Sequence, residues 1–298
     1  MDDDAIEVTR LAGSLGAEVR GLDLRTVTDA DQVLPLLVEH QVLFFPGQHL
    51  SIDEHVSFGR LFGDIQSHPH LKNPFTDHDQ IFELAASAGG VADEWHSDIT
   101  FAPEPALFSI LKVVECPDHG GDTMWASTYE AYDHLSAPMR DLCDGLTALH
   151  DAQPHGRSDK TAIHPVVRVH PATGRRALFV NEHFTRRIVE LSAAESAAVL
   201  GFLTSWVTQP QFTVRYHWTP GTVAIWDNRC TQHCVLNDFD AQRIVQRVTV
   251  MGDRPEGVGA PRWEPYVSVG RPGAAGRLDR QLHRHLDTVA ADGSPERA

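Results

Sequence analysis

In several stretches of the chain, hydrophobic residues recur every three to four positions, as they do along one face of a helix. The sequence predicts helices over residues 29–41, 51–63 and 192–208, and shorter ones over 127–135 and 136–150. Two helices begin with a serine followed three positions later by glutamate, Ser51 with Glu54 and Ser192 with Glu195. This is the capping box, in which both side chains accept free backbone amides at a helix start.

Other stretches alternate apolar and polar residues or form short apolar runs, as strands do. Strands are predicted at residues 42–45, 106–114, 164–170, 176–180, 212–218, 222–226 and 243–251. Residues 64–94 contain breakers and no sustained period, which predicts a long irregular stretch of the functional or mobile kind. Many short strands in the second half, with helices mainly early, favour a mainly β sandwich or barrel with flanking helices.

Toward the C-terminus, hydrophobic residues no longer recur with the period of a helix or a strand. From Gly270 onward the chain is rich in Gly, Ala, Arg and Asp. Such a composition buries little apolar surface. The sequence therefore predicts a single domain over residues 1–270 and a weakly ordered tail over residues 271–298.

Charge and cysteine content narrow the classes of function. The 298-residue chain has a net charge of −16 with histidine neutral, which argues against a nucleic-acid partner but leaves room for a small anion held by a few buried arginines. The four cysteines form neither a secreted framework nor a CxxC pair. The N-terminus is acidic, and no apolar run reaches membrane-spanning length. We expect a cytoplasmic protein with no membrane contact.

The segment Trp95-His96-Ser97-Asp98 is the strongest candidate for chemistry. In an extended chain, residues two apart point to the same side, so His96 and Asp98 present an imidazole and a carboxylate to one point. His233 is the best candidate for a third ligand. Two histidines and one carboxylate form the facial site that leaves three positions open on Fe(II). Alternatively, His96 is an ordinary histidine and Asp98 a loop cap.

Two arginines follow His233 on a predicted strand. Arg243 and Arg247 are four residues apart and share one face. One interpretation is an exposed strand with both arginines in water. However, both faces have the composition of partly buried surfaces, and an unpaired buried charge is costly. Arginine holds a planar carboxylate or a sulfonate through parallel hydrogen bonds, so the pair suggests two anion sites near the metal.

These motifs occur in an order that resembles one family. His96-Ser97-Asp98, Gly120-Gly121-Asp122-Thr123, Trp226-Asp227-Asn228-Arg229 with His233, and Arg243 with Arg247 are similar to the Fe(II)/2-oxoglutarate-dependent dioxygenases of the TauD/TfdA family. The resemblance runs from Val8 to Pro255. It implies a double-stranded β-helix, or jelly-roll, core. It also implies Fe(II), O2 and 2-oxoglutarate as cosubstrate.

The resemblance also implies roles for single residues. His96, Asp98 and His233 match the iron ligands, Arg243 matches the partner of the distal 2-oxoglutarate carboxylate, and Thr123 matches the hydroxyl that assists it. Trp95 and Trp125 fall at positions where the family has aromatic neighbours of the site, or else they simply pack in the core.

The substrate is expected to be a small organic anion. The resemblance implies that His68 and Arg247 hold its anionic group, with the backbone N–H of Ile99. Leu71 stands where taurine enzymes carry tyrosine, and Val91-Ala92 where they carry Asp-Asn. These departures favour an alkanesulfonate or alkyl sulfate over taurine, unless a one-residue gap moves Asp93 into place.

The predicted reaction is hydroxylation at the carbon bearing sulfur or oxygen, with release of succinate and CO2. The product then collapses to an aldehyde plus sulfite, sulfate or an alcohol. A phenoxyalkanoate-type or specialised-metabolite oxygenase is the alternative within the family. Two other functions on the same fold are less consistent with the sequence. A metal-dependent sensor or store would not need the cosubstrate site of Arg243 and Thr123. A halogenase would lack the carboxylate of Asp98, because halide takes its place on the metal. We expect a homo-oligomer, either a dimer or a tetramer.

Overall fold

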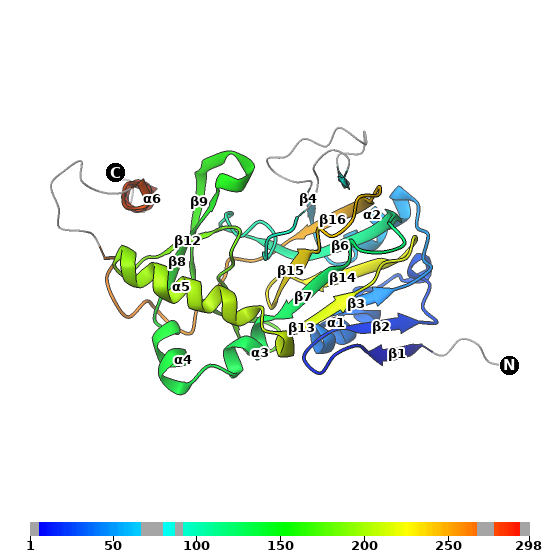
Figure 1. Cartoon of the computed structure of the whole chain (residues 1–298), viewed down its shortest axis with the longest axis horizontal. Coiled ribbons are helices and arrows are strands. Elements are labelled where there is room, and N and C mark those ends of the chain that lie inside the picture. The colour runs from blue at the N-terminus through cyan, green and yellow to red at the C-terminus, as the bar shows by residue number, and fades with distance from the viewer. Residues whose placement is uncertain (1–5, 67–79, 87–91, 267–276, 293–298) are drawn as a thin grey trace, which may run out of the picture.

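The largest element of the fold is an eight-stranded sheet (Figure 1). The computed structural model describes residues 6–66, 80–86, 92–266 and 277–292. Along the sheet, the strands are β1 (Glu7–Arg10), β2 (Ala17–Arg20), β3 (Val42–Phe45), β14 (Val223–Asp227), β6 (Ala106–Glu115), β16 (Ile244–Met251) and β4 (Ile65–Gln66). The eighth strand, β5 (Phe82–Ala85), also pairs with β16.

A smaller sheet faces the large one. Its strands, in order, are β13 (Thr213–Tyr216), β7 (Thr123–Ser127) and β15 (Thr231–Val235). Aromatic rings fill the space between the two sheets: Trp125 lies edge-on to Phe44 at 5.1 Å and to Trp226 at 5.7 Å. The indole of Trp125 is fully buried. Two facing sheets of this kind, antiparallel except for the pair β2–β3, fit the predicted jelly-roll core.

Strand β3 shows why the large sheet is apolar on both faces. Val42 and Phe44 belong to the cluster between the sheets, whereas Leu43 and Phe45 belong to the cluster on the opposite face. That opposite face is covered by α1 (Leu34–His40) and α2 (Ile52–Arg60). A strand buried on both sides contains a continuous apolar run rather than an alternation.

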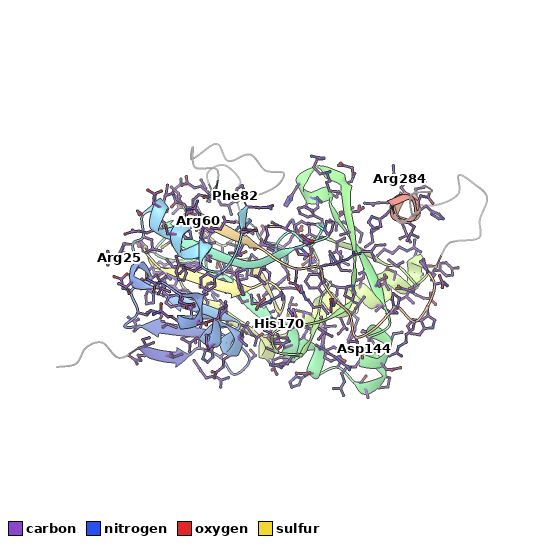
Figure 2. The ribbon with its side chains drawn as sticks, turned by 180° about the vertical axis from the view of Figure 1, so that it is seen from behind. Arg25, Arg60, Phe82, Asp144, His170 and Arg284 are labelled. Carbon is purple, nitrogen blue, oxygen red and sulfur yellow. The ribbon has the colours of Figure 1, made fainter. Side chains whose placement is uncertain are left out.

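A second group of elements extends the sandwich at one end (Figure 1). It contains a sheet of β12 (Thr185–Ile188), β8 (Thr147–Ala152) and β9 (Arg157–Pro165), and the hairpin β10 (Val167–Val169) with β11 (Arg176–Leu178). The helices here are α3 (Thr128–Asp133), α4 (Ala137–Cys143), α5 (Ala193–Val207) and α6 (Arg277–Asp292). The short 3-10 helices are Leu24–Thr26, Ala30–Gln32, Gln153–His155 and Pro210–Phe212. Seen from behind, His170 lies near the middle of the molecule, with Arg25 and Arg284 at opposite ends (Figure 2).

Most predicted elements are confirmed. The fold is mainly β with flanking helices, and α2 and α5 begin with complete capping boxes at Ser51 and Ser192. The hairpin predicted around Pro171–Gly174 is also present. None of the described helices is long and apolar enough to cross a membrane.

Several stretches differ from the sequence prediction, and strands β12 and β15 were not predicted. Residues 147–150 begin strand β8 instead of continuing a helix, because Ala148 and Leu149 are fully buried and pair with strands on both sides. The stretch 64–94, predicted to be irregular, contains β4 and β5. The predicted tail contains α6, in which Gln281 and Leu282 are buried against the β8–β9 sheet. The division into a domain and a tail stays a prediction.

Candidate metal centre and substrate pocket

The structure brings His96, Asp98 and His233 together. Their ligand atoms all lie within 4.8 Å of one another. Nε2 of His96 is 3.8 Å from Oδ1 of Asp98, and Nε2 of His233 is 3.9 Å from Oδ2. The cause is a backbone bridge between distant segments: the His96 amide donates to the His233 carbonyl at 3.1 Å, and the reverse bond is 2.8 Å.

The protonation states of this cluster suit a divalent cation. Burial lowers the pKa of both His96 and His233, so the imidazoles are neutral. Nδ1 of His96 lies 2.7 Å from the Glu94 carbonyl, which leaves Nε2 facing Asp98. Burial alone would raise the pKa of Asp98, but the charge of Arg247 and the hydrogen bond from Ser109 hold this pKa below its usual range. Two neutral imidazoles and a carboxylate fit Fe(II).

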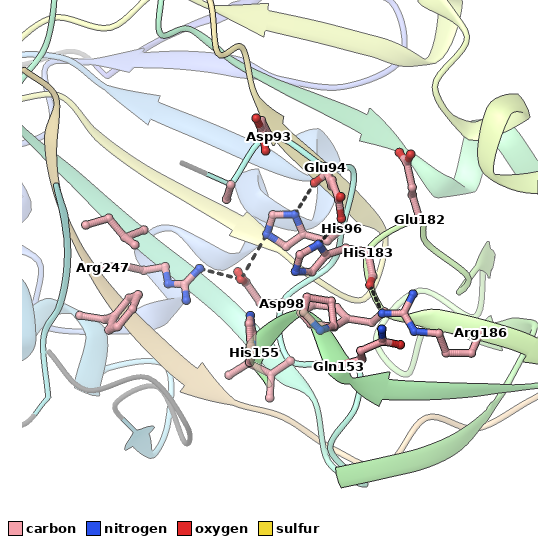
Figure 3. Close-up of a pocket in the computed structure, with 16 residues that line it drawn as sticks. Asp93, Glu94, His96, Asp98, Gln153, His155, Glu182, His183, Arg186 and Arg247 are labelled. Atoms are coloured by element: carbon pink, nitrogen blue, oxygen red, sulfur yellow. Dashed lines mark hydrogen bonds and ion pairs between the residues drawn. The ribbon is translucent and has the colours of Figure 1, made fainter. Parts of the chain in front are cut away.

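Asp98 is held on both of its oxygens. Nη1 of Arg247 donates to Oδ1 at 2.6 Å (Figure 3). The Ser109 hydroxyl donates to Oδ2 at 2.7 Å. Asn228 accepts from the Asp98 amide at 3.1 Å and donates to Ser109 at 3.0 Å. A carboxylate has about four lone-pair sites, so these partners leave capacity for a metal. Ser109 was not predicted as a site residue, although a lone serine in an apolar strand was a signal.

A second buried network supports the turn before His233. Asp227 contacts Nε2 of His170 at 2.9 Å and accepts hydrogen bonds from Nε and Nη2 of Arg229, the shortest at 2.9 and 2.6 Å. His170, Asp227 and Cys230 lie close enough to hold a metal. However, the carboxylate is already engaged, and burial raises the pKa of the Cys230 thiol well above its usual value. We therefore assign this network a structural role.

Arg243 and Thr123 are also neighbours. Nη2 of Arg243 lies 3.4 Å from the Thr123 hydroxyl, and Nε donates to the Gly121 carbonyl at 3.2 Å. Burial lowers the pKa of Arg243 to about 10. Among the described residues, no carboxylate lies within ion-pair distance of this guanidinium. A buried cation in this condition suits an incoming anion. Trp125 packs against His233 beside this site, with ring centroids 6.4 Å apart.

The metal cluster opens into a pocket of about 720 Å³ (Figure 3). Its apolar wall includes Phe82, Leu84 and Phe184. At the rim, Glu94 and His183 are paired at 2.5 Å. A smaller cavity of about 30 Å³ lies beside Arg243, and Arg247 lines both spaces. Arg247 therefore stands between the metal pocket and the Arg243 site.

The remaining predicted site residues can now be placed. Ile99 lines the pocket directly after Asp98. His68 lies outside the described residues, as do Leu71 and Val91. Asp93 reaches the pocket wall, where it accepts a hydrogen bond from Asn237 at 2.9 Å.

Known proteins share both sequence and structure with this chain. The family described as "Taurine catabolism dioxygenase TauD, TfdA family" matches residues 7–249. An alpha-ketoglutarate-dependent sulfate ester dioxygenase of Pseudomonas putida is 39% identical over 279 residues, which cover 85% of this chain and 92% of that protein. An (S)-phenoxypropionate/alpha-ketoglutarate-dioxygenase of Delftia acidovorans is 31% identical over 291 residues, covering 86% of this chain and 98% of that protein. The crystal structure of a putative alpha-ketoglutarate-dependent taurine dioxygenase from Burkholderia xenovorans superposes with a TM-score of 0.78 at 37% identity, covering 90% of this chain and 99% of that one.

Proposed function

Since the chain belongs to the TauD/TfdA family of Fe(II)- and 2-oxoglutarate-dependent dioxygenases, we propose that it hydroxylates a small organic sulfate or sulfonate anion. The protein is an oxidoreductase that uses Fe(II), 2-oxoglutarate and O2. The observation that carries the proposal is the buried cluster of His96, Asp98 and His233 with Arg247 beside it and Arg243 nearby.

We assign the metal to the neutral Nε2 atoms of His96 and His233 and to the Asp98 carboxylate. Fe(II), with 2-oxoglutarate and O2, supplies the oxidising equivalents for C–H hydroxylation, and 2-oxoglutarate leaves as succinate and CO2. Ser109 and Arg247 fix the Asp98 carboxylate, and the Glu94 carbonyl fixes His96. Ligands held by such outer partners keep their geometry during turnover.

We assign the two anion sites to different molecules. Arg243 and Thr123 bind the distal carboxylate of 2-oxoglutarate, because their donors have no anionic partner among the described residues. Arg247 binds the anionic group of the primary substrate, with the Ile99 amide and, from the sequence, His68. The Ile99 amide has no acceptor among the described residues, and its residue lines the pocket.

Pocket size and lining favour a substrate with an apolar tail. Taurine is far smaller than a space of about 720 Å³ and would leave the apolar part of the wall, Phe82, Leu84 and Phe184, without a contact. An alkyl sulfate would fill this wall with its chain. Hydroxylation of the carbon bearing the sulfate oxygen then breaks the C–O bond, which gives an aldehyde and inorganic sulfate. A phenoxyalkanoate is the second candidate, because the same wall accepts a ring, but the relative that supports it is less similar.

The test is 2-oxoglutarate consumption by the purified protein with Fe(II) and O2. Hexyl sulfate, hexanesulfonate, taurine and 2-phenoxypropionate are offered separately. We expect hexyl sulfate to stimulate turnover most, with one sulfate released for each succinate. Asp98→Ala is the matched control and should release none. Turnover stimulated only by 2-phenoxypropionate would establish the alternative instead.

Two further features of the proposal rest on the sequence. We infer a cytoplasmic location from the cysteine usage. We also infer a homo-oligomer, a dimer or a tetramer. Size-exclusion chromatography with light scattering tests the second inference, and a monomer at all concentrations would refute it.

A further inference from the structure

The residue that follows the Asp98 metal ligand has an unusual backbone. Ile99 has a φ of +58°, in the left-handed region. β-Branched residues avoid this region because their side chains clash with the backbone. Of the described non-glycine residues with positive φ, Gln41, His49 and Ile99, only Ile99 is β-branched and lines the pocket. Such strain persists only when the surrounding structure enforces it.

A buried polar network surrounds the next residue, Thr100. Its hydroxyl contacts Nδ1 of His150 at 3.0 Å and accepts from the Asn181 amide group at 3.1 Å. Its carbonyl lies 2.9 Å from Nε2 of His164, which also contacts the Ala102 carbonyl at 3.0 Å. His150, His164 and Asn181 come from β8, β9 and the segment before β12, and all three are buried.

The network is itself anchored, so it can resist movement of the turn. The side-chain oxygen of Asn181 accepts a hydrogen bond from the backbone N–H of Phe184 at 2.8 Å. The backbone N–H of Asn181 donates to the Thr185 hydroxyl at 2.9 Å. The Ala102 amide donates to the Ile99 carbonyl at 3.0 Å and closes the turn. Everything after Ile99 is therefore fixed. The φ angle of Ile99 then sets the direction of the peptide before it, which carries the Ile99 N–H and joins Asp98.

We propose that Thr100, with His150 and Asn181, is a positioning residue that holds Ile99 in the left-handed conformation. In this way it aims the Ile99 N–H into the pocket, toward the anionic group of the substrate. The inference rests on the proposed function, because that function places an anion at this N–H. Arg243 and Thr123 lie outside the turn, so 2-oxoglutarate binding is independent of it.

A double-mutant cycle with Thr100→Val and Ile99→Gly tests the proposal. Thr100→Val removes the hydroxyl and lets Ile99 relax, so the KM for hexyl sulfate should rise about tenfold while the KM for 2-oxoglutarate changes little. Thr100→Ser retains the hydroxyl and should restore the KM to within about twofold. In the Ile99→Gly background, Thr100→Val should change the KM less than about twofold, because glycine adopts this φ without strain.

Thermal unfolding gives a readout that needs no turnover, and it is measured on the wild type, the two single variants Thr100→Val and Ile99→Gly, and the double variant. In the wild-type background, Thr100→Val removes hydrogen bonds, which lowers stability, but it also relieves the strain at Ile99, which raises stability. The two effects on the Tm therefore partly cancel. In the Ile99→Gly background no strain remains to be relieved. Thr100→Val should therefore lower the Tm more in that background than in the wild type. This result would stand even if hexyl sulfate proved not to be a substrate, which separates failure of the positioning role from failure of the proposed function.

A matched control is Thr222→Val, which removes a buried hydroxyl bonded to Thr219 at 2.8 Å and lining neither cavity. It should leave both KM values unchanged. Equal effects of Thr100→Val in the two backgrounds, on both the KM and the Tm, would overturn the proposal and leave Thr100 as an ordinary packing residue.

Discussion

Arg247→Ala separates the substrate anion site from the cosubstrate site. Arg247 is buried, and its Nη1 is bonded to Asp98 at 2.6 Å. Its Nε is buried without a partner among the described residues, so further donors are available to an anion. A buried charge-assisted hydrogen bond contributes about 1.5–3 kcal/mol, and each 1.4 kcal/mol is about tenfold in affinity. The KM for hexyl sulfate should therefore rise about tenfold to somewhat over a hundredfold.

The other parameters should respond differently. The KM for 2-oxoglutarate should change little, because Arg243 is intact. Fe(II) affinity should fall, because Asp98 loses a partner that fixes its carboxylate. Initial rates of sulfate release give both KM values, and calorimetry gives the Fe(II) affinity.

Arg186→Ala is the matched control for this experiment. Arg186 also lines the pocket, but its guanidinium is occupied by Asp151 at 2.6 Å and by the His183 carbonyl at 2.6 Å. We expect a much smaller rise in the KM for hexyl sulfate. If Arg247→Ala instead raised only the KM for 2-oxoglutarate, the roles of Arg243 and Arg247 would be reversed.

Three further predictions concern the metal, the cosubstrate and pH. His96→Ala, Asp98→Ala and His233→Ala should each abolish turnover and greatly weaken Fe(II) binding in calorimetry, with circular dichroism little changed. Arg243→Lys keeps the charge but loses the planar fork, so the KM for 2-oxoglutarate should rise strongly while that for hexyl sulfate does not. Burial lowers the pKa of His55 to about 3, so below about pH 6.5 the unfolded chain binds a proton that the folded chain does not. Stability should then fall by at most about 1.4 kcal/mol per pH unit from this group, and urea unfolding of His55→Gln at pH 7, 6 and 5 should show a shallower loss.

Each of these predictions has a result that contradicts it. Full activity of any of the three metal-ligand variants would remove that residue from the metal site. An unchanged KM for 2-oxoglutarate in Arg243→Lys would show that the fork is not needed. Identical pH slopes for His55→Gln and the wild type would mean that His55 is protonated equally in both states.

Local signals were enough to predict most elements of the fold. The run Val42–Phe45 and the capping box at Ser51 are readable because their determinants lie within a few residues. Strand β8 was missed because its identity depends on pairing with β9 and β12, which no local pattern encodes. Strand β5 has only four residues, and it exists because β16 offers it an edge.

The same distinction holds in the site. His96, Asp98 and Arg243 stand in recognisable motifs, so the sequence was sufficient to nominate them. Ser109 and His150 were not nominated, because their importance comes from contacts with Asp98 and Thr100 that only the folded chain creates. Positions that orient a ligand have no fixed spacing from it, whereas the ligands His96 and Asp98 lie two positions apart in one motif.

The charges of the site give a separate reason to expect an anionic substrate without an ammonium group. Arg243, Arg247 and Asp98 are buried and sum to one positive charge, since burial keeps His96 and His233 neutral. A divalent metal ion and the 2-oxoglutarate dianion cancel each other, which leaves that single positive charge in a low-dielectric space. A sulfate monoester or an alkanesulfonate neutralises it. Taurine has no net charge and would leave it uncompensated, so hexyl sulfate should outcompete taurine at equal concentration; a clear preference for taurine would show that an acidic residue reaches its amine.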